Sequence, residues 1–253
     1  MDLSLNETQQ MLRNTAKDFF ASECPETHVR EMETDNEGYN KQLWEKIVNQ
    51  GWLGIPFPEK YGGFGLSFLE FCILLEEAGR VLLPEPLFEA VLLGGMPILV
   101  SGNEKQKEEL LPKVISGESI VTLAFYEEDD LISPLSVQTN ATLNNNVYNL
   151  NGTKMFVPNA NIADLILVTA RTGNNDEDIS LFIIPSTAEG ITISPLFEAG
   201  SRQGSDTLIL ERKIVSRLGG FFIEALDRCL SGRSRPPTVI PRPRQRYVGT
   251  DYV

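Results

Sequence analysis

The 253-residue sequence predicts an α+β fold: an N-terminal helical bundle, then a small antiparallel β-barrel or sandwich domain, then a short irregular C-terminal tail. Apolar residues recur at helical spacing up to about residue 118. From residue 119 they fall into short runs rich in β-branched and aromatic side chains. Prolines and arginines dominate the end of the chain. We therefore expect a helical domain at 1–118, a β domain at 119–215 and an atypical basic, proline-rich tail at 216–253.

The first expected helix begins at a capping box formed by Ser4 and Glu7 and ends before Cys24 and Pro25. Its apolar positions recur at helical spacing: Leu5, Leu12, Ala16, Phe19 and Phe20. A second apolar stripe, at residues 43–48, is followed by Gly51, a residue suited to a helix C-cap. Both segments are therefore predicted to be helices of the bundle.

Glycine and proline crowd residues 51–66, which we expect to form a structured connection because its aromatic side chains would not all be left in water. Its glycines match neither G-x-G-x-x-G nor the Walker pattern, so we expect a packing role and no nucleotide loop. Ser67 and Glu70 then form a second capping box. Residues 68–78 are apolar on nearly every face, which predicts a helix buried on several sides, with Cys72 in the core. Two further helical patterns complete the bundle, at 87–100 and 103–115.

Six short runs predict the strands of the β domain. Clusters rich in asparagine and glycine at 144–146 and 173–176 separate some of these runs and are typical of turns. The runs lie at residues 120–126, 137–143, 147–157, 165–170, 179–184 and 191–193.

Charge and hydropathy argue against nucleic-acid binding and against a membrane span. With 22 Lys+Arg against 35 Asp+Glu, the chain carries a formal net charge of −13, which disfavours binding to nucleic acid. The end of the chain departs from this balance, because residues 211–253 hold 9 basic and 4 acidic side chains. No stretch approaches the roughly 18 apolar residues of a membrane span, and no basic and apolar leader follows Met1. We therefore expect a cytoplasmic protein without a membrane anchor.

Single motifs show little chemistry. Cys24, Cys72 and Cys229 have no paired spacing, so the sequence predicts neither a zinc knuckle nor a disulfide framework. His28 is the only histidine; it lies in an acidic helical segment and is expected on the surface. The acidic run at 127–130 is expected to be a solvated loop after a strand. No catalytic residue and no metal ligand is assigned.

Three segments, in this order, resemble the acyl-CoA dehydrogenase family: residues 43–87, 101–128 and 150–171. The first contains GRVLLPEP at 79–86 and the last contains FVP at 156–158, which is similar to a branch of the family in which heteromeric assemblies are known. The likeness extends from residue 1 to about residue 215. It implies a helical domain and a β-barrel domain, followed in the family by a C-terminal four-helix bundle, with FAD held between the barrel and the bundle.

The resemblance also implies a reaction, the α,β-desaturation of an acyl-CoA thioester, in which a carboxylate removes the α-proton and the β-hydrogen leaves as hydride to the flavin. A family strand that runs beside the flavin matches residues 123–127, and a family segment that packs on the flavin ring matches residues 156–158. The residues that the resemblance places against FAD are Leu123, Phe125, Tyr126, Phe156, Val157 and Pro158.

This chain departs from the family pattern at several positions. Tyr126 stands where the family has threonine, Pro158 has no hydroxyl to offer near the ring, and an acidic stretch at 128–131 replaces the usual Gly-Ser-Asp. Nothing in residues 216–253 matches the bundle that carries the catalytic glutamate in the family. The resemblance therefore implies a truncated FAD-dependent acyl-CoA dehydrogenase that is weak or inactive alone. The alternative is a non-catalytic partner subunit of a heteromeric acyl-CoA dehydrogenase complex.

The resemblance implies three kinds of partner. An acyl-CoA is the expected substrate, and an electron-transfer flavoprotein or a similar acceptor is expected to take the electrons. The family also implies a homo- or hetero-oligomer. Neither nucleic acid nor a membrane is expected as a partner.

Overall fold

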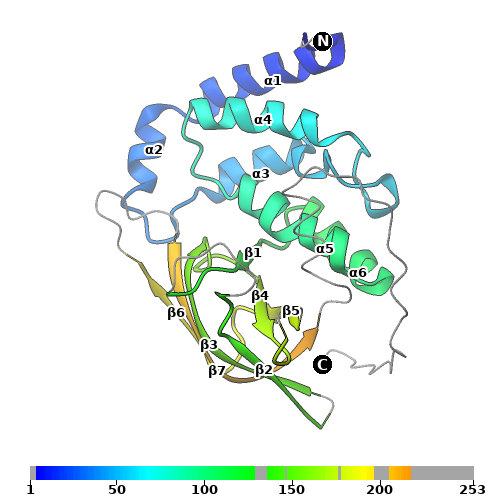
Figure 1. Ribbon diagram of the computed structural model, residues 1–253. Helices are drawn as coiled ribbons and strands as arrows, with labels where there is room; N and C mark the ends of the chain where they lie inside the picture. The colour runs from blue at the N-terminus through cyan, green and yellow to red at the C-terminus, as the bar shows by residue number, and fades with distance from the viewer. Residues whose placement is uncertain (1–3, 129–135, 146, 176–177, 197–204, 218–253) are drawn as a thin grey trace.

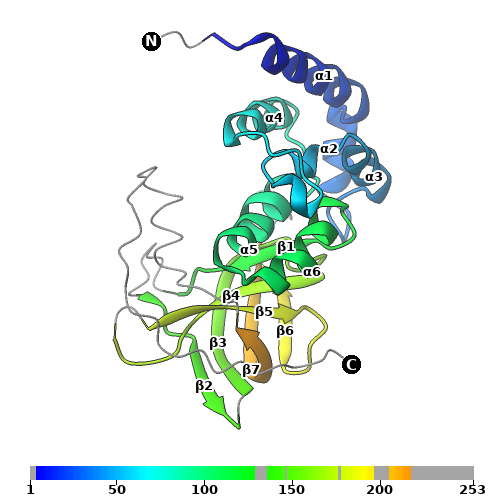
Figure 2. The ribbon, with the colours of Figure 1, turned by 90° about the vertical axis from the view of Figure 1, so that its right-hand side faces the viewer.

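The computed structural model describes residues 4–128, 136–145, 147–175, 178–196 and 205–217. Its helices form one region and its strands form a curled sheet beneath them (Figure 1). The side view in Figure 2 shows the helices stacked above the sheet, with β1 at the junction. The predicted order, a helical region followed by a β region, is confirmed.

The helical region begins at Asn6, which caps α1. The Asn6 side chain accepts a hydrogen bond from the Gln9 backbone N–H, and the Gln9 side chain accepts one from the Asn6 N–H. The capping box is therefore formed by this pair, and the expected pair of Ser4 and Glu7 is wrong because the helix begins at Glu7 itself. In chain order the helices are α1 (Glu7–Glu23), α2 (Glu26–Met32), α3 (Lys41–Asn49), the 3-10 turns η1 (Trp52–Gly54) and η2 (Glu59–Tyr61), α4 (Phe68–Arg80), the π-helical segment η3 (Glu89–Gly95), α5 (Met96–Ser101) and α6 (Glu104–Ile115).

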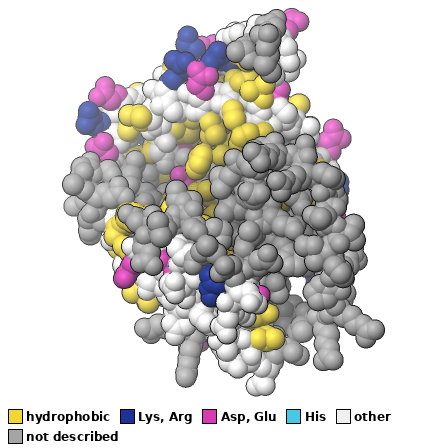
Figure 3. Space-filling view, in the orientation of Figure 1, with side chains coloured by type: hydrophobic (Ala, Val, Ile, Leu, Met, Phe, Trp, Pro, Cys, Tyr) yellow, Lys and Arg dark blue, Asp and Glu magenta, His cyan; other side chains and the backbone are white. Residues whose placement is uncertain are grey.

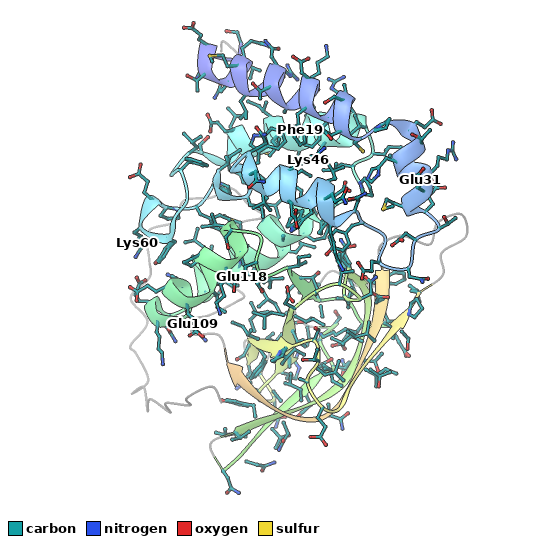
Figure 4. The ribbon with its side chains drawn as sticks, turned by 180° about the vertical axis from the view of Figure 1, so that it is seen from behind. Phe19, Glu31, Lys46, Lys60, Glu109 and Glu118 are labelled. Atoms are coloured by element: carbon teal, nitrogen blue, oxygen red, sulfur yellow. The ribbon has the colours of Figure 1, made fainter. Side chains whose placement is uncertain are left out.

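The glycine-rich connection after α3 is packed, as expected. Gly51 has a φ of 75°, the left-handed conformation that suits it to end a helix. The ring of the next residue, Trp52, lies edge-on to Phe19 with centroids 4.9 Å apart. Phe19 lies between α1 and the helices below it (Figure 4). Farther along the connection, Phe57 is fully buried.

Helix α4 is covered on one side. Ser67 caps it, its side chain accepting from the Leu69 N–H, and Phe71 and Leu74 are fully buried on the inner face. Phe68 is 50% exposed and Cys72 is exposed. The expectation that α4 is buried on several sides with Cys72 in the core is wrong for the described residues, because none of them covers this outer face. Figure 3 shows hydrophobic side chains gathered on this face of the molecule.

The strands form one seven-stranded sheet within the described ranges. Pairings run from β4 through β2, β3, β7 and β5 back to β4, so the sheet curls on itself; β1 flanks β4, and β6 flanks β7. The strands are β1 (Val121–Ala124), β2 (Asn140–Asn144), β3 (Val147–Pro158), β4 (Leu165–Arg171), β5 (Ile179–Pro185), β6 (Ile191–Pro195) and β7 (Ser205–Arg217).

Two features of the sheet differ from the sequence prediction. The sheet is mixed, because β1 pairs with β4 in parallel, with Val121 opposite Leu165. The hairpin of β2 and β3 lies between these two strands in the chain, so β4 re-enters the sheet in the direction of β1. The second difference is β7, a long strand that no predicted run covered. Apart from Ser216 and Arg217, which end β7, the irregular tail predicted at 216–253 lies outside the described residues.

The two regions share a core. One cluster of buried side chains combines the inner faces of the helices with Val121, Leu167, Leu181 and Ile183 from β1, β4 and β5. A second cluster fills the inside of the curled sheet and includes Ile166, Val168 and Phe182. Alternate residues of β4 therefore face the helices and the sheet interior. No helix in the described ranges is long and apolar enough to cross a membrane.

Candidate functional site

The end of β1 and the end of β3 lie side by side. The Tyr126 carbonyl accepts a hydrogen bond from the Met155 N–H at 3.0 Å. The Thr122 hydroxyl donates to the Pro158 carbonyl at 2.6 Å. The structure thus brings together the two segments, 123–127 and 156–158, that the resemblance places against a flavin. We call the residues Phe125, Tyr126 and Phe156 the aromatic edge.

A bulge in β3 places Phe156 at this edge. The register between β3 and β7 shifts between Lys154 and Val157, and both of these residues are fully buried. In a regular strand alternate residues share a face, so the extra residue leaves both Met155 and Phe156 half-buried. Phe156 takes a φ of 52°, a left-handed conformation that is costly for a side chain with a Cβ. Such conformations persist where the surrounding structure holds them, often at functional sites.

The aromatic edge is partly exposed. Phe125, Tyr126 and Phe156 are each half-buried, and the rings of the first two meet edge-on with centroids 5.6 Å apart. Leu123 and Phe125 also pack against the helical core. Partly exposed aromatic side chains can pack against a flat aromatic ligand. The Thr122 hydroxyl is already donated to Pro158, which itself has neither an N–H nor a hydroxyl.

A buried ion pair between Lys154 and Glu127 holds the segment that follows β1. The Lys154 side chain is fully buried, and its Nζ donates to Glu127 Oε1 at 2.6 Å, to Thr169 Oγ1 at 2.9 Å and to the Phe125 carbonyl at 3.3 Å. Glu127 also accepts from the backbone N–H groups of Gln138 and Thr139. The expectation that Glu127 is solvated is therefore wrong, because Lys154 holds it inside the sheet. Asp129 and Asp130 of the same acidic run lie outside the described residues.

Burial and charge act in opposite directions on this ion pair. Burial alone would raise the pKa of Glu127, but the Lys154 ammonium and the hydrogen bonds from Lys154 and Thr139 hold that pKa below its ordinary value. Burial lowers the pKa of Lys154. Glu127 is thus an ionised, fully engaged carboxylate that shapes the site and has no free oxygen with which to abstract a proton.

A cavity of about 570 Å³ lies between the helical region and the sheet. Leu75, Leu83 and Phe88 line it from α4 and the segment after it, and Asn159, just after β3, and Asp206 of β7 line it from the sheet. Because its walls come from distant segments, periodicity gave no sign of it. The one signal in the sequence was GRVLLPEP at 79–86, which supplies part of one wall.

Two carboxyl groups in the cavity wall were missed by the sequence analysis. Burial raises the pKa of Glu89, and burial also raises the pKa of Asp206, which accepts a hydrogen bond from the Asn161 N–H at 2.9 Å. Carboxyl groups with raised pKa values in a cavity are candidates for binding or proton transfer. Neither lay in a motif, because burial depends on contacts between segments far apart in the chain.

His28 lies in the interior. The expectation of a surface position is wrong, because the residue is 9% exposed and its Nε2 lies 2.9 Å from Oε1 of the buried Glu85. The side of helix α2 that carries His28 packs against the segment that follows α4, which contains Glu85.

Comparison with known proteins places the two regions in one family. The family model "Acyl-CoA dehydrogenase, N-terminal domain" matches residues 6–118, and "Acyl-CoA dehydrogenase, middle domain" matches residues 122–213. "Probable acyl-CoA dehydrogenase YngJ" of Bacillus subtilis is 32% identical, over 82% of this chain and 55% of that protein. The mitochondrial isovaleryl-CoA dehydrogenase of Pongo abelii is 33% identical over 80% and 49%. "Caffeyl-CoA reductase-Etf complex subunit CarC" of Acetobacterium woodii is 29% identical over 74% and 50%.

Solved structures share the fold. An acyl-CoA dehydrogenase from Geobacillus kaustophilus has a TM-score of 0.80 at 26% identity, covering 91% of this chain and 63% of that one. One from Bacillus anthracis, complexed with FAD, has a TM-score of 0.78 at 27% identity, with 88% and 39% covered. The ChsE4-ChsE5 complex from Mycobacterium tuberculosis gives 0.77 at 25% identity, with 89% and 61% covered.

The chain spans about half the length of the relatives named here. The matches follow one another in the order of the two structural regions. The chain belongs to the acyl-CoA dehydrogenase family, of which it carries the N-terminal and middle domains.

Proposed function

We propose that the protein serves FAD-dependent α,β-desaturation of an acyl-CoA thioester. The observation that carries this proposal is the aromatic edge, three half-buried aromatic residues on two segments that backbone hydrogen bonding holds side by side, with the β3 bulge at Phe156. Asn159, three residues after Phe156, lines the cavity between the two regions. A ring on the aromatic edge and an acyl group in the cavity would then lie at the same junction.

The proposed roles follow from burial. Tyr126 and Phe156 would pack against the isoalloxazine ring, and Leu123 and Phe125 would support it from the helical side. Val157 is fully buried, and the Pro158 carbonyl accepts a hydrogen bond from the Thr122 hydroxyl. These two residues would therefore hold the bulge in place. When bound, FAD supplies the hydride acceptor. The complex of the Bacillus anthracis relative with FAD supports the choice of FAD as the cofactor.

The acyl group would enter the cavity. Leu75, Leu83 and Phe88 offer an apolar lining suited to a hydrocarbon chain and keep water from it. Glu127 is fully engaged by Lys154, so we do not propose it as the base. A general base contributes about a hundred- to ten-thousand-fold to such a reaction. The resemblance assigns that role to no carboxylate of this chain, so we expect the chain by itself to react slowly.

The second candidate function is that of a non-catalytic partner subunit. Phe64, Phe68 and Leu69 are 53%, 50% and 52% exposed on α4 and the loop before it, and contiguous apolar surface of this kind is typical of interfaces. The ChsE4-ChsE5 complex, a structure of two named components with this fold, supports the idea of an oligomer. The Acetobacterium woodii relative, named as a subunit of an Etf complex, supports an electron-transfer flavoprotein as the acceptor. A cytoplasmic location is part of the proposal, supported by cysteines without paired spacing.

The first experiment is an absorbance spectrum of the purified chain, followed by titration with FAD. We expect flavin bands in the visible range and saturable quenching of flavin fluorescence. Phe156→Ala should weaken FAD binding, whereas Leu143→Ala, which removes an exposed leucine from β2, should leave it unchanged. A folded protein that never binds FAD would overturn the cofactor proposal.

The second experiment separates the two candidate functions. A panel of acyl-CoA thioesters and an artificial electron acceptor are added to the chain alone, and to the chain co-purified with a longer family member. Slow turnover by the FAD-loaded chain alone supports the enzyme. Turnover that needs the partner and survives Phe156→Ala in this chain supports the subunit.

A further inference from the structure

Three potential metal ligands meet where α1 and α2 approach the segment after α4. Cys24 Sγ, a ring nitrogen of His28 and a carboxylate oxygen of Glu85 all lie within 4.8 Å of one another. Cys24 is 3% exposed, His28 9% and Glu85 3%. The proposed flavin site uses none of these side chains.

Local structure fixes each of the three. Cys24 is the C-cap of α1, and its backbone N–H donates to the Phe20 carbonyl. Pro25 is the N-cap of α2, so His28, four residues after Cys24, lies on the same side of the corner. Glu85 stands between two prolines, which restrict the backbone on both sides of it. The side chains thus come from two rigid segments, 57 residues apart between His28 and Glu85.

Within the described residues, one oxygen of this cluster has no partner. Glu85 Oε1 lies 2.9 Å from His28 Nε2, and the Asn40 N–H lies 3.4 Å from the same oxygen. Glu85 Oε2 is buried and accepts no hydrogen bond from any described group. A buried carboxylate oxygen without a partner is costly, so native structures usually satisfy it with a hydrogen bond, a water or an ion.

Sulfur, imidazole nitrogen and carboxylate oxygen are the donor set that zinc prefers in proteins. Around a tetrahedral Zn²⁺, bond lengths of about 2.0–2.3 Å put ligand atoms about 3.5 Å apart. Movements of about 1 Å would therefore bring the three groups to coordinating distance from their present limit of 4.8 Å. We propose that Cys24, His28 and Glu85 bind one Zn²⁺ ion, with a water molecule as the fourth ligand.

The cavity provides a route for the ion and a place for the water. Glu85 is one of the cavity's lining residues. The exposed carboxylates of Asp35 and Glu37 line the same cavity, and their negative charge attracts cations. On binding, the ion would displace the proton between His28 and Glu85, and this proton and that of the Cys24 thiol would both pass to solvent.

The ion would act as a clamp. It would tie the corner between α1 and α2 to the segment that leads from α4 into η3, and so fix one wall of the cavity. The competing interpretation is a metal-free cluster in which His28 and Glu85 only hydrogen-bond. The two differ in metal content and in the reactivity of Cys24, neither of which depends on flavin binding or turnover.

The test uses the full chain, purified without a polyhistidine tag, stripped with a chelator and then loaded with Zn²⁺ or Co²⁺. We expect one zinc per chain by elemental analysis and, with Co²⁺, a thiolate-to-cobalt charge-transfer band. Mass spectrometry after alkylation should show Cys24 protected by Zn²⁺ and the exposed Cys72 unprotected. The metal should also raise the thermal unfolding midpoint.

Variants assign the ligands. Cys24→Ser should abolish the charge-transfer band, and His28→Gln and Glu85→Gln should each weaken Zn²⁺ binding by more than about tenfold. Cys72→Ser is the matched control and should change nothing. A wild-type chain that takes up no metal at equimolar zinc, or a folded Cys24→Ser variant that keeps the full charge-transfer band, would overturn the proposal. If Cys24→Ser does not fold, the cobalt spectrum and the alkylation map of the wild-type chain still decide it.

Discussion

Glu127 in the sheet and Glu85 and Glu89 in the helical region are buried carboxylates with opposite surroundings. In the sheet, Glu127 has a lysine and two backbone N–H groups as partners, and its pKa lies below the ordinary value. In the helical region, burial raises the pKa of Glu89, and Glu85 has one oxygen without a partner in the described structure. Glu127 therefore stabilises the sheet, whereas Glu85 and Glu89, beside the cavity, could still accept hydrogen bonds from a ligand or coordinate one.

Removing the partner of the engaged carboxylate should have the largest effect. Lys154→Met leaves Glu127 buried without its counter-charge, and we expect a loss of about 3 kcal/mol in the free energy of unfolding, measured in urea. Lys46→Met removes a surface ion pair with Glu23 and should cost less than about 1 kcal/mol.

A double variant sharpens this result. Lys154→Met with Glu127→Gln removes both charges and should be more stable than Lys154→Met alone, because no uncompensated ion remains. Equal losses in the single and the double variant would mean that packing of the lysine stem, and not its charge, stabilises the sheet.

The second prediction tests the seam between the two regions. A Cβ added at Gly94 in η3 would lie 2.5 Å from the Val121 carbonyl oxygen in β1, so Gly94→Ala should destabilise the protein by about 2 kcal/mol. Gly79→Ala in α4 is the control; a Cβ there meets nothing within 4 Å, and we expect a gain of about 0.5 kcal/mol. Far-ultraviolet dichroism should show helices and strands unfolding together. Loss of the helices alone would mean that the regions are not coupled.

The third prediction concerns backbone strain. Phe156→Gly should be about 1 kcal/mol more stable than Phe156→Ala, because glycine adopts the φ of 52° without a Cβ penalty. Both variants should lose FAD affinity, since both lack the ring. Leu82, with a φ of 55° in the helical region, offers the parallel pair, Leu82→Gly against Leu82→Ala. A glycine variant no more stable than its alanine partner would show that the conformation carries no strain.

The smallest effect is in the pH dependence of the two kinds of carboxylate. Because burial raises the pKa of Glu89, the folded state holds that proton where the unfolded state has lost it, and stability falls as pH rises above the ordinary value of 4.5. Glu89→Gln should therefore gain on the wild type with rising pH. Glu127, whose pKa is lowered, contributes stability that is lost as pH falls below 4.5, so the deficit of Glu127→Gln should shrink there. Urea unfolding at a series of pH values measures both.

Much of the fold was predictable because local signals and burial agreed. The apolar stripe at 43–48 with Gly51 after it became α3, and Asn103 to Ile115 became α6. Strand β7 was missed because the predicted runs ended at residue 193, although apolar and β-branched residues recur within 205–217. Helix α4 looked buried on every side because composition records apolar residues, not what covers them.

The candidate site was predictable only where the family pattern reached it. The two strand segments were expected to lie near one another, and the hydrogen bond from Met155 to Tyr126 joins them. The inward position of His28 and the burial of Lys154 both depend on partners far away in the chain, Glu85 and Glu127. Charged side chains are expected at the surface unless a partner is identified, and periodicity identifies none across such separations.

The approach of Gly94 to Val121 also governs how the molecule could be divided. The sequence patterns change near residue 118. A cut there would expose Leu167, Leu181 and Ile183 of the sheet to water, and it would also expose the inner faces of the helices that pack against them. Each fragment made separately would expose a large apolar surface, so the fragments would aggregate or associate with one another. Expression of the halves as independent pieces should therefore fail unless they are supplied together, as a complementing pair.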